Sequence, residues 1–180
     1  MKARPLLLLL LALAVGLSGC GYTATRILPS YYRTIYIEPL QNKIPITKDV
    51  SEKIGFVTNY PEIEQKTTQG VIDRFLFDGN LRVINKPEEA DLLLTGSIFD
   101  FYRQPLRRKE DDTVEEYRLN LSASLTLRDK RGKLLLQEPA MIGDTTYFVT
   151  GATARLEASA VDDLVTDFSR RVVEWVIEYW

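Results

Sequence analysis

The stretch EEYRLNLSASLTLR, residues 115–128, decides the fold class. Apolar side chains stand at every second position from Tyr117 to Leu127, and polar side chains fill the positions between them. Such alternation is typical of a β-strand with one buried face, because successive side chains point to opposite sides of a sheet. We therefore expect a long strand that covers one side of a hydrophobic core.

The segments on either side of this strand predict a hairpin and a central neighbour. Asp129 and Gly132 stand at the first and last positions of a stretch that favours a type I turn. The return strand is expected at residues 133–137 and again at 145–149, after Pro139. Upstream, residues 92–102 predict another strand, and its opening run of three leucines indicates burial on both faces and a central position.

Two segments have the three- and four-residue apolar spacing of amphipathic helices, namely residues 62–78 and the chain from about Thr153 to its end. Shorter strands are expected at 33–38 and 81–84. We predict that residues 31–180 form a single α+β domain, a two-layer sandwich. A mainly antiparallel sheet of four to five strands should carry two helices packed on one face. The connection 40–61 is unusually long and apolar, so it is either a mobile insertion or a functional loop.

The N-terminus begins with basic residues, followed by an apolar run at 6–15 that is too short to span a bilayer. Small residues then lead to Cys20, the only cysteine, and this ending resembles the bacterial lipobox. The resemblance implies a signal peptide at 1–19, lipidation of Cys20 including a palmitate-type acyl chain, and a lipidated tether at 20–30. A plain signal peptide with an incidental cysteine and a membrane-spanning anchor are the alternatives.

The composition excludes several classes of function. Lys2 and Arg4 would be removed with the signal peptide. Of the 23 basic residues, fewer than the 25 acidic residues then remain, so the mature chain carries a net negative charge. A net negative charge argues against a general nucleic-acid binder. The chain has no histidine, and it contains no nucleophile elbow, glycine-rich phosphate loop or metal-ligand spacing. We expect no enzyme, no cofactor and no metal site.

Several short segments together resemble the lipopolysaccharide-assembly lipoprotein family, LptE. In chain order they are GCGY at 19–22, TIYIEPLQNK at 34–43, LRVI at 81–84, ADLLLTG at 90–96, EYRL at 116–119, LTLRD at 125–129 and RRVVE at 170–174. Their order and spacing after the lipobox carry the resemblance. The chain departs from the family pattern at Ile44, where the family tends to have threonine, and in a longer link to the first helix.

The resemblance implies an outer-membrane lipoprotein that plugs and helps assemble a β-barrel translocon (LptD), which delivers lipopolysaccharide to the outer leaflet. The implied partners are an LptD-like barrel, lipopolysaccharide and the outer membrane through the lipid anchor, with no nucleic acid. The implied location is the periplasmic side of the outer membrane or the barrel lumen. The alternatives are a pilot or accessory lipoprotein of another envelope machine, such as a secretin, and a lipid-carrying module that acts alone.

Two basic clusters are candidate contacts for lipopolysaccharide phosphates, because arginine and lysine suit phosphate groups. The first surrounds the predicted hairpin turn and consists of Arg128, Lys130, Arg131 and Lys133. The second is expected in the connection after the strand at 92–102 and includes Arg103, Arg107, Arg108 and Lys109. From these we select Arg128, Lys130, Arg131, Lys133, Arg107 and Arg108 as candidate lipopolysaccharide-binding residues. The alternative is a solvated hairpin that its charges keep soluble.

Aromatic residues provide a second candidate surface, because tyrosine and tryptophan are favoured at interfaces. Tyr31, Tyr32 and Tyr36 flank the first predicted strand, and Trp175, Tyr179 and Trp180 lie at the end of the last helix. Core packing is the alternative, and it is expected for Trp175.

Overall fold

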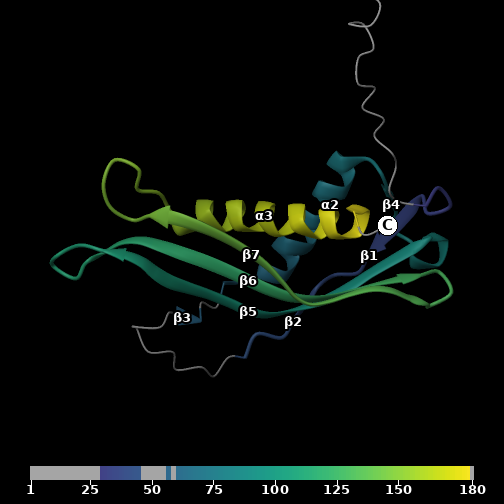
Figure 1. The fold of residues 1–180 in the computed structure, drawn as a ribbon, viewed down its shortest axis with the longest axis horizontal. Helices are drawn as coiled ribbons and strands as arrows, with labels where there is room; N and C mark the ends of the chain where they lie inside the picture. Colours follow the sequence, from purple (N-terminus) through teal and green to yellow (C-terminus); the bar gives the residue numbers. More distant parts are fainter. Residues whose placement is uncertain (1–28, 46–55, 58–59, 179–180) are drawn as a thin grey trace, which may run out of the picture.

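The computed structural model describes residues 29–45, 56–57 and 60–178. Cys20, the signal segment, most of the connection 40–61, and Tyr179 and Trp180 lie outside the described residues. Three long strands dominate the fold, namely β5 (Leu92–Arg108), β6 (Val114–Asp129) and β7 (Leu134–Phe148), and they form an antiparallel meander (Figure 1). At the usual rise per residue, β5 extends over roughly 55 Å.

Four short strands complete the sheet on the side of β5 away from β6. β1 (Thr34–Ile37) pairs in parallel with β5 and with β4 (Arg82–Val83), so the main path of the sheet is β4-β1-β5-β6-β7. β2 (Gln41–Asn42) is also parallel to β5, whereas β3 (Phe56–Val57) is antiparallel to it. The expectation of a mainly antiparallel sheet was therefore wrong, because the sheet is mixed. A helix separates β1 from β4 along the chain, and such a crossover returns the chain in the same direction.

The alternation that decided the fold class is confirmed in β6. Leu119, Leu121, Ala123, Leu125 and Leu127 are almost fully buried on one face of the strand. The central position of β5 is also confirmed, since it lies between β1 and β6. The opposite face of β6 is polar but is not fully solvated. Asn120 and Ser122 are buried there, and the hydroxyls of Ser97 and Ser124 lie 3.0 Å apart across β5 and β6.

The two α-helices of the described chain are α2 (Ile63–Asp78) and α3 (Glu157–Glu178), and both lie on the same side of the sheet in Figure 1; a short 3-10 helix, η1 (Pro87–Glu89), precedes β5. α3 packs on β7 and β6, and α2 packs on α3. The approach of α3 is close, because a Cβ added at Gly143 would lie 2.7 Å from the Cβ of Phe168 and 3.0 Å from its Cα. Glycine at 143 thus allows the helix backbone to approach the sheet. Trp175 packs against the core, as expected.

Two strands are longer than the sequence predicted. β5 continues to Arg108, so Arg103, Arg107 and Arg108 lie on a strand and the expectation of a connection there was wrong. Pro105 is tolerated because β3 pairs with β5 only at residues 102 and 103, which leaves the next part of β5 without a second described neighbour. β7 passes through Pro139 without interruption, because the register between β6 and β7 shifts at this point, as at a β-bulge.

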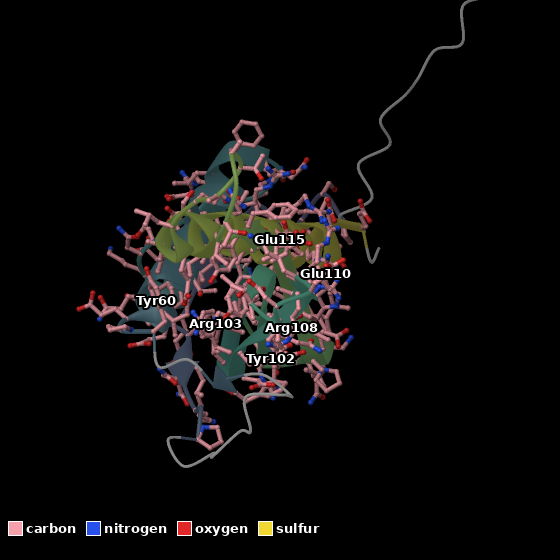
Figure 2. All side chains as sticks on the ribbon, turned by 90° about the vertical axis from the view of Figure 1, so that its left-hand side faces the viewer. Tyr60, Tyr102, Arg103, Arg108, Glu110 and Glu115 are labelled. Atoms are coloured by element: carbon pink, nitrogen blue, oxygen red, sulfur yellow. The ribbon has the colours of Figure 1, made fainter. Side chains whose placement is uncertain are left out.

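The last helix starts later than expected, at Glu157, and a network of polar and aromatic contacts fixes this start to the sheet. The carboxylate of Glu157 lies 2.5 Å from a guanidinium nitrogen of Arg103 on β5 and accepts a hydrogen bond of 2.9 Å from the Tyr147 hydroxyl on β7. The guanidinium also lies over the ring of Tyr117, 4.7 Å from its centre. Figure 2 looks onto this end of the molecule, where Arg103 is labelled.

Part of the outer edge of β7 has its backbone amides already engaged. The amide of Ala140 donates to the Glu138 carboxylate at 3.1 Å, and the amide of Asp144 donates to the Asp167 carboxylate of α3, also at 3.1 Å. Pro139 between them has no amide hydrogen. An edge protected in this way is a poor template for pairing with another strand. No helix in the described part of the chain has the length and apolar character required to cross a bilayer.

The buried face of β6 leads to a first prediction. Leu125→Asp places a charge at a site that is 1% exposed and should destabilise the domain by about 3 kcal/mol or more. Thr126→Asp adds the same charge on the opposite, half-buried face and should cost much less. Thermal or urea unfolding measures both, and equal losses of stability would contradict the assigned faces.

The network at the start of α3 leads to a second prediction. Burial, together with the hydrogen bond to Glu157, raises the pKa of Tyr147 to about 12, although Arg103 acts in the opposite direction. The unfolded chain ionises its tyrosines near the ordinary pKa of 10.0. The stabilisation that Tyr147 provides is therefore complete below pH 10 and is lost as the pH rises through about 12.

Tyr147→Phe should remove this part of the alkaline loss of stability. The free energy of unfolding would be measured by urea titration between pH 7 and pH 12, with the pH 7 values of each protein as its own reference. A decline between pH 10 and pH 12 that is equally steep in the wild type and in the variant would contradict the assignment.

Candidate functional site

The hairpin between β6 and β7 forms a compact basic tip. The amide of Gly132 donates to the carbonyl of Asp129 at 2.9 Å, which closes the predicted turn. One oxygen of the Asp129 carboxylate accepts the amides of Arg131 and Lys133, at 2.8 and 2.9 Å. This carboxylate is therefore engaged by the backbone, and the side chains of the tip residues are left to project from the turn.

Asp91, which directly precedes β5, connects the tip to the start of β1. One of its carboxylate oxygens, Oδ2, accepts the amides of Arg33 and Thr34 at 3.0 and 3.2 Å and the Thr34 hydroxyl at 3.1 Å. Its carbonyl accepts the amide of Lys130 at 3.0 Å. Burial opposes ionisation of Asp91, but these hydrogen bonds and the charge of Lys130 outweigh it, so the pKa of Asp91 is lowered.

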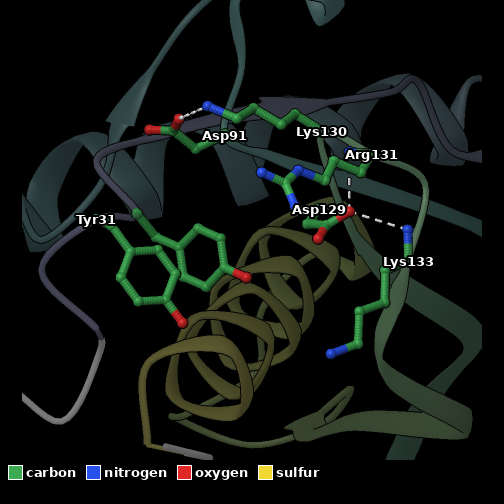
Figure 3. A pocket seen from close by; sticks show the side chains of 7 residues that line it. Tyr31, Asp91, Asp129, Lys130, Arg131 and Lys133 are labelled. Carbon is green, nitrogen blue, oxygen red and sulfur yellow. Dashed lines mark hydrogen bonds and ion pairs between the residues drawn. The ribbon is translucent and has the colours of Figure 1, made fainter.

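These elements enclose a pocket of about 500 Å³, shown in Figure 3. Two tyrosines form one wall, with ring centres 4.4 Å apart, and they come from the segment that precedes β1. The tip and Asp91 form the remaining walls. The lining residues are Tyr31, Tyr32, Asp91, Asp129, Lys130, Arg131 and Lys133.

The charges in the pocket favour an anion. The ammonium group of Lys130 lies 3.6 Å from the second carboxylate oxygen of Asp91, Oδ1. Within the described residues, the side chains of Arg131 and Lys133 form no hydrogen bond or ion pair, and both are exposed. Burial raises the pKa of Tyr32, and neighbouring Tyr31 and Asp129 add to the effect, so this ring stays neutral. Cations beside neutral aromatic rings can hold a phosphate attached to a sugar or a lipid.

The structure separates the candidate residues that sequence analysis selected. Lys130, Arg131 and Lys133 line the pocket, whereas Arg128 does not, because its guanidinium donates to the carbonyl of Gly132 at 3.0 Å. Arg107 and Arg108 lie at the other end of the meander, where Arg107 pairs with Glu116 on β6. Residues 116 and 129 of one strand are separated by roughly 43 Å, so the two basic clusters cannot act on one phosphate.

The arginines of the second cluster already have partners. Arg107 lies 3.7 Å from the Glu116 carboxylate and over the ring of Phe148. Arg108 donates to the carbonyl of Asp112 at 3.0 Å and lies 3.4 Å from its carboxylate. The arginines at this end of the sheet are therefore paired within the chain.

The sequence did not identify Asp91 and Asp129 as members of the site. It also did not predict that Tyr31 and Tyr32 lie beside the hairpin tip. The aspartate at the start of a turn is a recognisable signal for Asp129. Asp91 carries no comparable local signal, since its role depends on the pairing of β1 with β5, which joins segments far apart in the chain.

Comparison with solved structures defines the class of fold. The chain is similar to a hypothetical protein from Chlamydia trachomatis, with 12% identity, a TM-score of 0.53, and coverage of 82% of this chain and 97% of that one. It is also similar to an uncharacterised lipoprotein B from Nitrosomonas europaea, with 17% identity, a TM-score of 0.51, and coverage of 84% and 85%. A protein from Xanthomonas campestris gives 10% identity, a TM-score of 0.53, and coverage of 86% and 89%. At these identities the likeness is one of fold.

The fold is thus that of an α+β domain, and in this chain it carries a basic pocket at one hairpin tip. A family model described as LptE, lipopolysaccharide-assembly, matches residues 32–174. Since this match covers most of the sequence, the chain belongs to the LptE family. No curated protein matches the chain.

Proposed function

We propose that this protein is a lipid-anchored plug and assembly partner of an outer-membrane β-barrel that delivers lipopolysaccharide to the outer leaflet. The observation that carries the proposal is the family match over residues 32–174, which links nearly the whole domain to lipopolysaccharide assembly. The protein acts by binding and positioning, and not as an enzyme. Its partner is a barrel of the LptD kind.

The anchor is the acylated Cys20 that follows the signal peptide at 1–19. One acyl chain gives only marginal membrane binding, so the several chains on a lipoprotein cysteine are needed for stable attachment. The tether at 20–30 leads directly to Tyr31 and Tyr32 in the pocket wall. The domain then lies at the periplasmic side of the outer membrane or in the barrel lumen, with the pocket at the end from which the tether leaves.

The tip pocket contacts phosphate groups of lipopolysaccharide. Arg131 and Lys133 supply exposed cations, Lys130 can turn from Asp91 toward a ligand, and the tyrosine rings offer a flat surface for a sugar. Arg128, Arg107 and Arg108 are less suited to this contact because their guanidinium groups already have partners within the chain.

The double change Lys130→Glu and Arg131→Glu should weaken lipopolysaccharide binding at least tenfold, because it replaces two attractive charges in the pocket with repulsive ones. Both residues are exposed, so stability should change little. Affinity of the purified protein would be measured at two salt concentrations, since exposed charges are screened over about 8 Å at physiological ionic strength. The matched control is Arg107→Glu with Arg108→Glu at the far end of the sheet. Equal losses from both pairs, or no salt dependence, would argue against the tip contact.

The partner is tested by purifying the tagged, lipidated protein from membranes in mild detergent. We expect a large β-barrel that carries lipopolysaccharide to accompany the wild type, and also to accompany the Lys130→Glu, Arg131→Glu variant, because a plug contacts its barrel over a much broader surface than one turn. Recovery of a secretin ring in place of the barrel would support the alternative of a pilot lipoprotein and contradict the proposed function.

A further inference from the structure

Asp91 introduces a negative charge into a pocket that is otherwise suited to anions. Its two carboxylate oxygens are used differently. Oδ2 accepts three hydrogen bonds from Arg33 and Thr34, which fixes the group to the start of β1. Oδ1 faces the ammonium of Lys130 at 3.6 Å. The carboxylate is thus held in place on one side and faces a cation on the other.

Lys130 is the more exposed member of this ion pair. Its side chain is 64% exposed, whereas that of Asp91 is 21% exposed. The separation of 3.6 Å is longer than a good charge-assisted hydrogen bond, which lies near 2.8 Å. An anion that enters the pocket can therefore draw Lys130 away from Asp91 without disturbing the backbone that Asp91 holds.

Asp129, the other carboxylate of the lining, does not compete in this way. Its Oδ1 is occupied by the amides of Arg131 and Lys133, which belong to the turn itself. Asp91 is therefore the carboxylate of the pocket that is ion-paired with a lysine of the tip.

We propose that Asp91 is an exchangeable internal counter-ion that lowers the affinity of the tip pocket for phosphate and so favours release of the lipid. The proposal rests on the proposed contact between the tip and lipopolysaccharide. In the empty pocket Lys130 is neutralised by Asp91, and in the occupied pocket it is shared with the bound phosphate. Asp91 also positions the tyrosine wall, because its Oδ2 fixes residues 33 and 34 directly after Tyr31 and Tyr32.

The two roles predict different effects for two substitutions at Asp91. Asp91→Asn keeps an oxygen that can accept the amides of Arg33 and Thr34 but removes the charge that faces Lys130. It should therefore tighten lipopolysaccharide binding about threefold, which is the effect of a partly exposed ion pair. Asp91→Ala removes the acceptor as well, so the tyrosine wall is no longer fixed and binding should be weaker than in Asp91→Asn. A purely structural role predicts that both substitutions weaken binding.

A double-mutant cycle with Lys130→Gln separates exchange from general electrostatics. If Asp91 acts through Lys130, the gain from Asp91→Asn shrinks when Lys130 is already glutamine. Glu88→Gln is the matched control. It also removes one negative charge, but Glu88 is exposed, lies three residues before Asp91 in the sequence and does not line the pocket. Glu88→Gln should leave the affinity unchanged.

Binding would be measured with the full, lipidated protein in a nonionic detergent. The probes are lipopolysaccharide and, separately, inorganic phosphate followed through the NMR signals of residues 130–133. Tighter binding by Asp91→Asn that depends on Lys130 supports the counter-ion. Weaker binding by Asp91→Asn, the same gain in both Lys130 backgrounds, or an equal gain from Glu88→Gln would overturn it while leaving the tip contact intact. Failure of the wild-type tip to bind either probe would overturn the counter-ion and the proposed contact together.

Discussion

The packing of α3 on the apolar face of β6 and β7 is the interaction on which the rest of the structure depends. It buries Leu121 and Phe168 and requires Gly143, because any larger residue would bring a Cβ into the helix backbone. Once this contact forms, β7 is fixed along its length, and its hairpin partner β6 places the basic tip at one end. Because the strands are long, the packing of α3 on the sheet also determines where the pocket at the hairpin tip lies.

The start of α3 is held by a separate set of contacts. Glu157 begins the helix where Arg103 and Tyr147 from two strands converge on its carboxylate. The charge of Arg103 is neutralised within this network. Arg107 and Arg108 form ion pairs with nearby carboxylates. The two ends of the meander therefore differ in character although both are rich in arginine or lysine. One end pairs its arginines internally, and the other leaves Arg131 and Lys133 exposed.

The features that could be predicted from sequence are those that depend on neighbours in the chain. The alternation in β6, the turn at Asp129–Gly132 and the helix at 62–78 each follow from local periodicity or turn chemistry, and the structure reproduces them. The direction of β1 relative to β5 could not be read locally, because it depends on how α2 returns the chain to the sheet. For the same reason the cations of the site were found from sequence and Asp91 was not. Asp91 matters because it contacts β1, β5 and the hairpin tip at once. These segments are far apart in the chain, so no short stretch of sequence indicates the contact.

The engaged part of the β7 edge has a consequence for the proposed association with a barrel. A β-barrel that is still closing has unpaired first and last strands. These strands can pair with any open strand edge nearby, which would then become an additional strand of the barrel wall. Pro139 and the carboxylates that hold the amides of Ala140 and Asp144 interrupt the outer edge of β7, so an incoming strand cannot pair with it continuously there. Contacts through side chains alone leave the closing of the barrel to its own strands. In the proposed role, the protein would therefore stay inside the finished barrel as a separate body and would not become part of its wall.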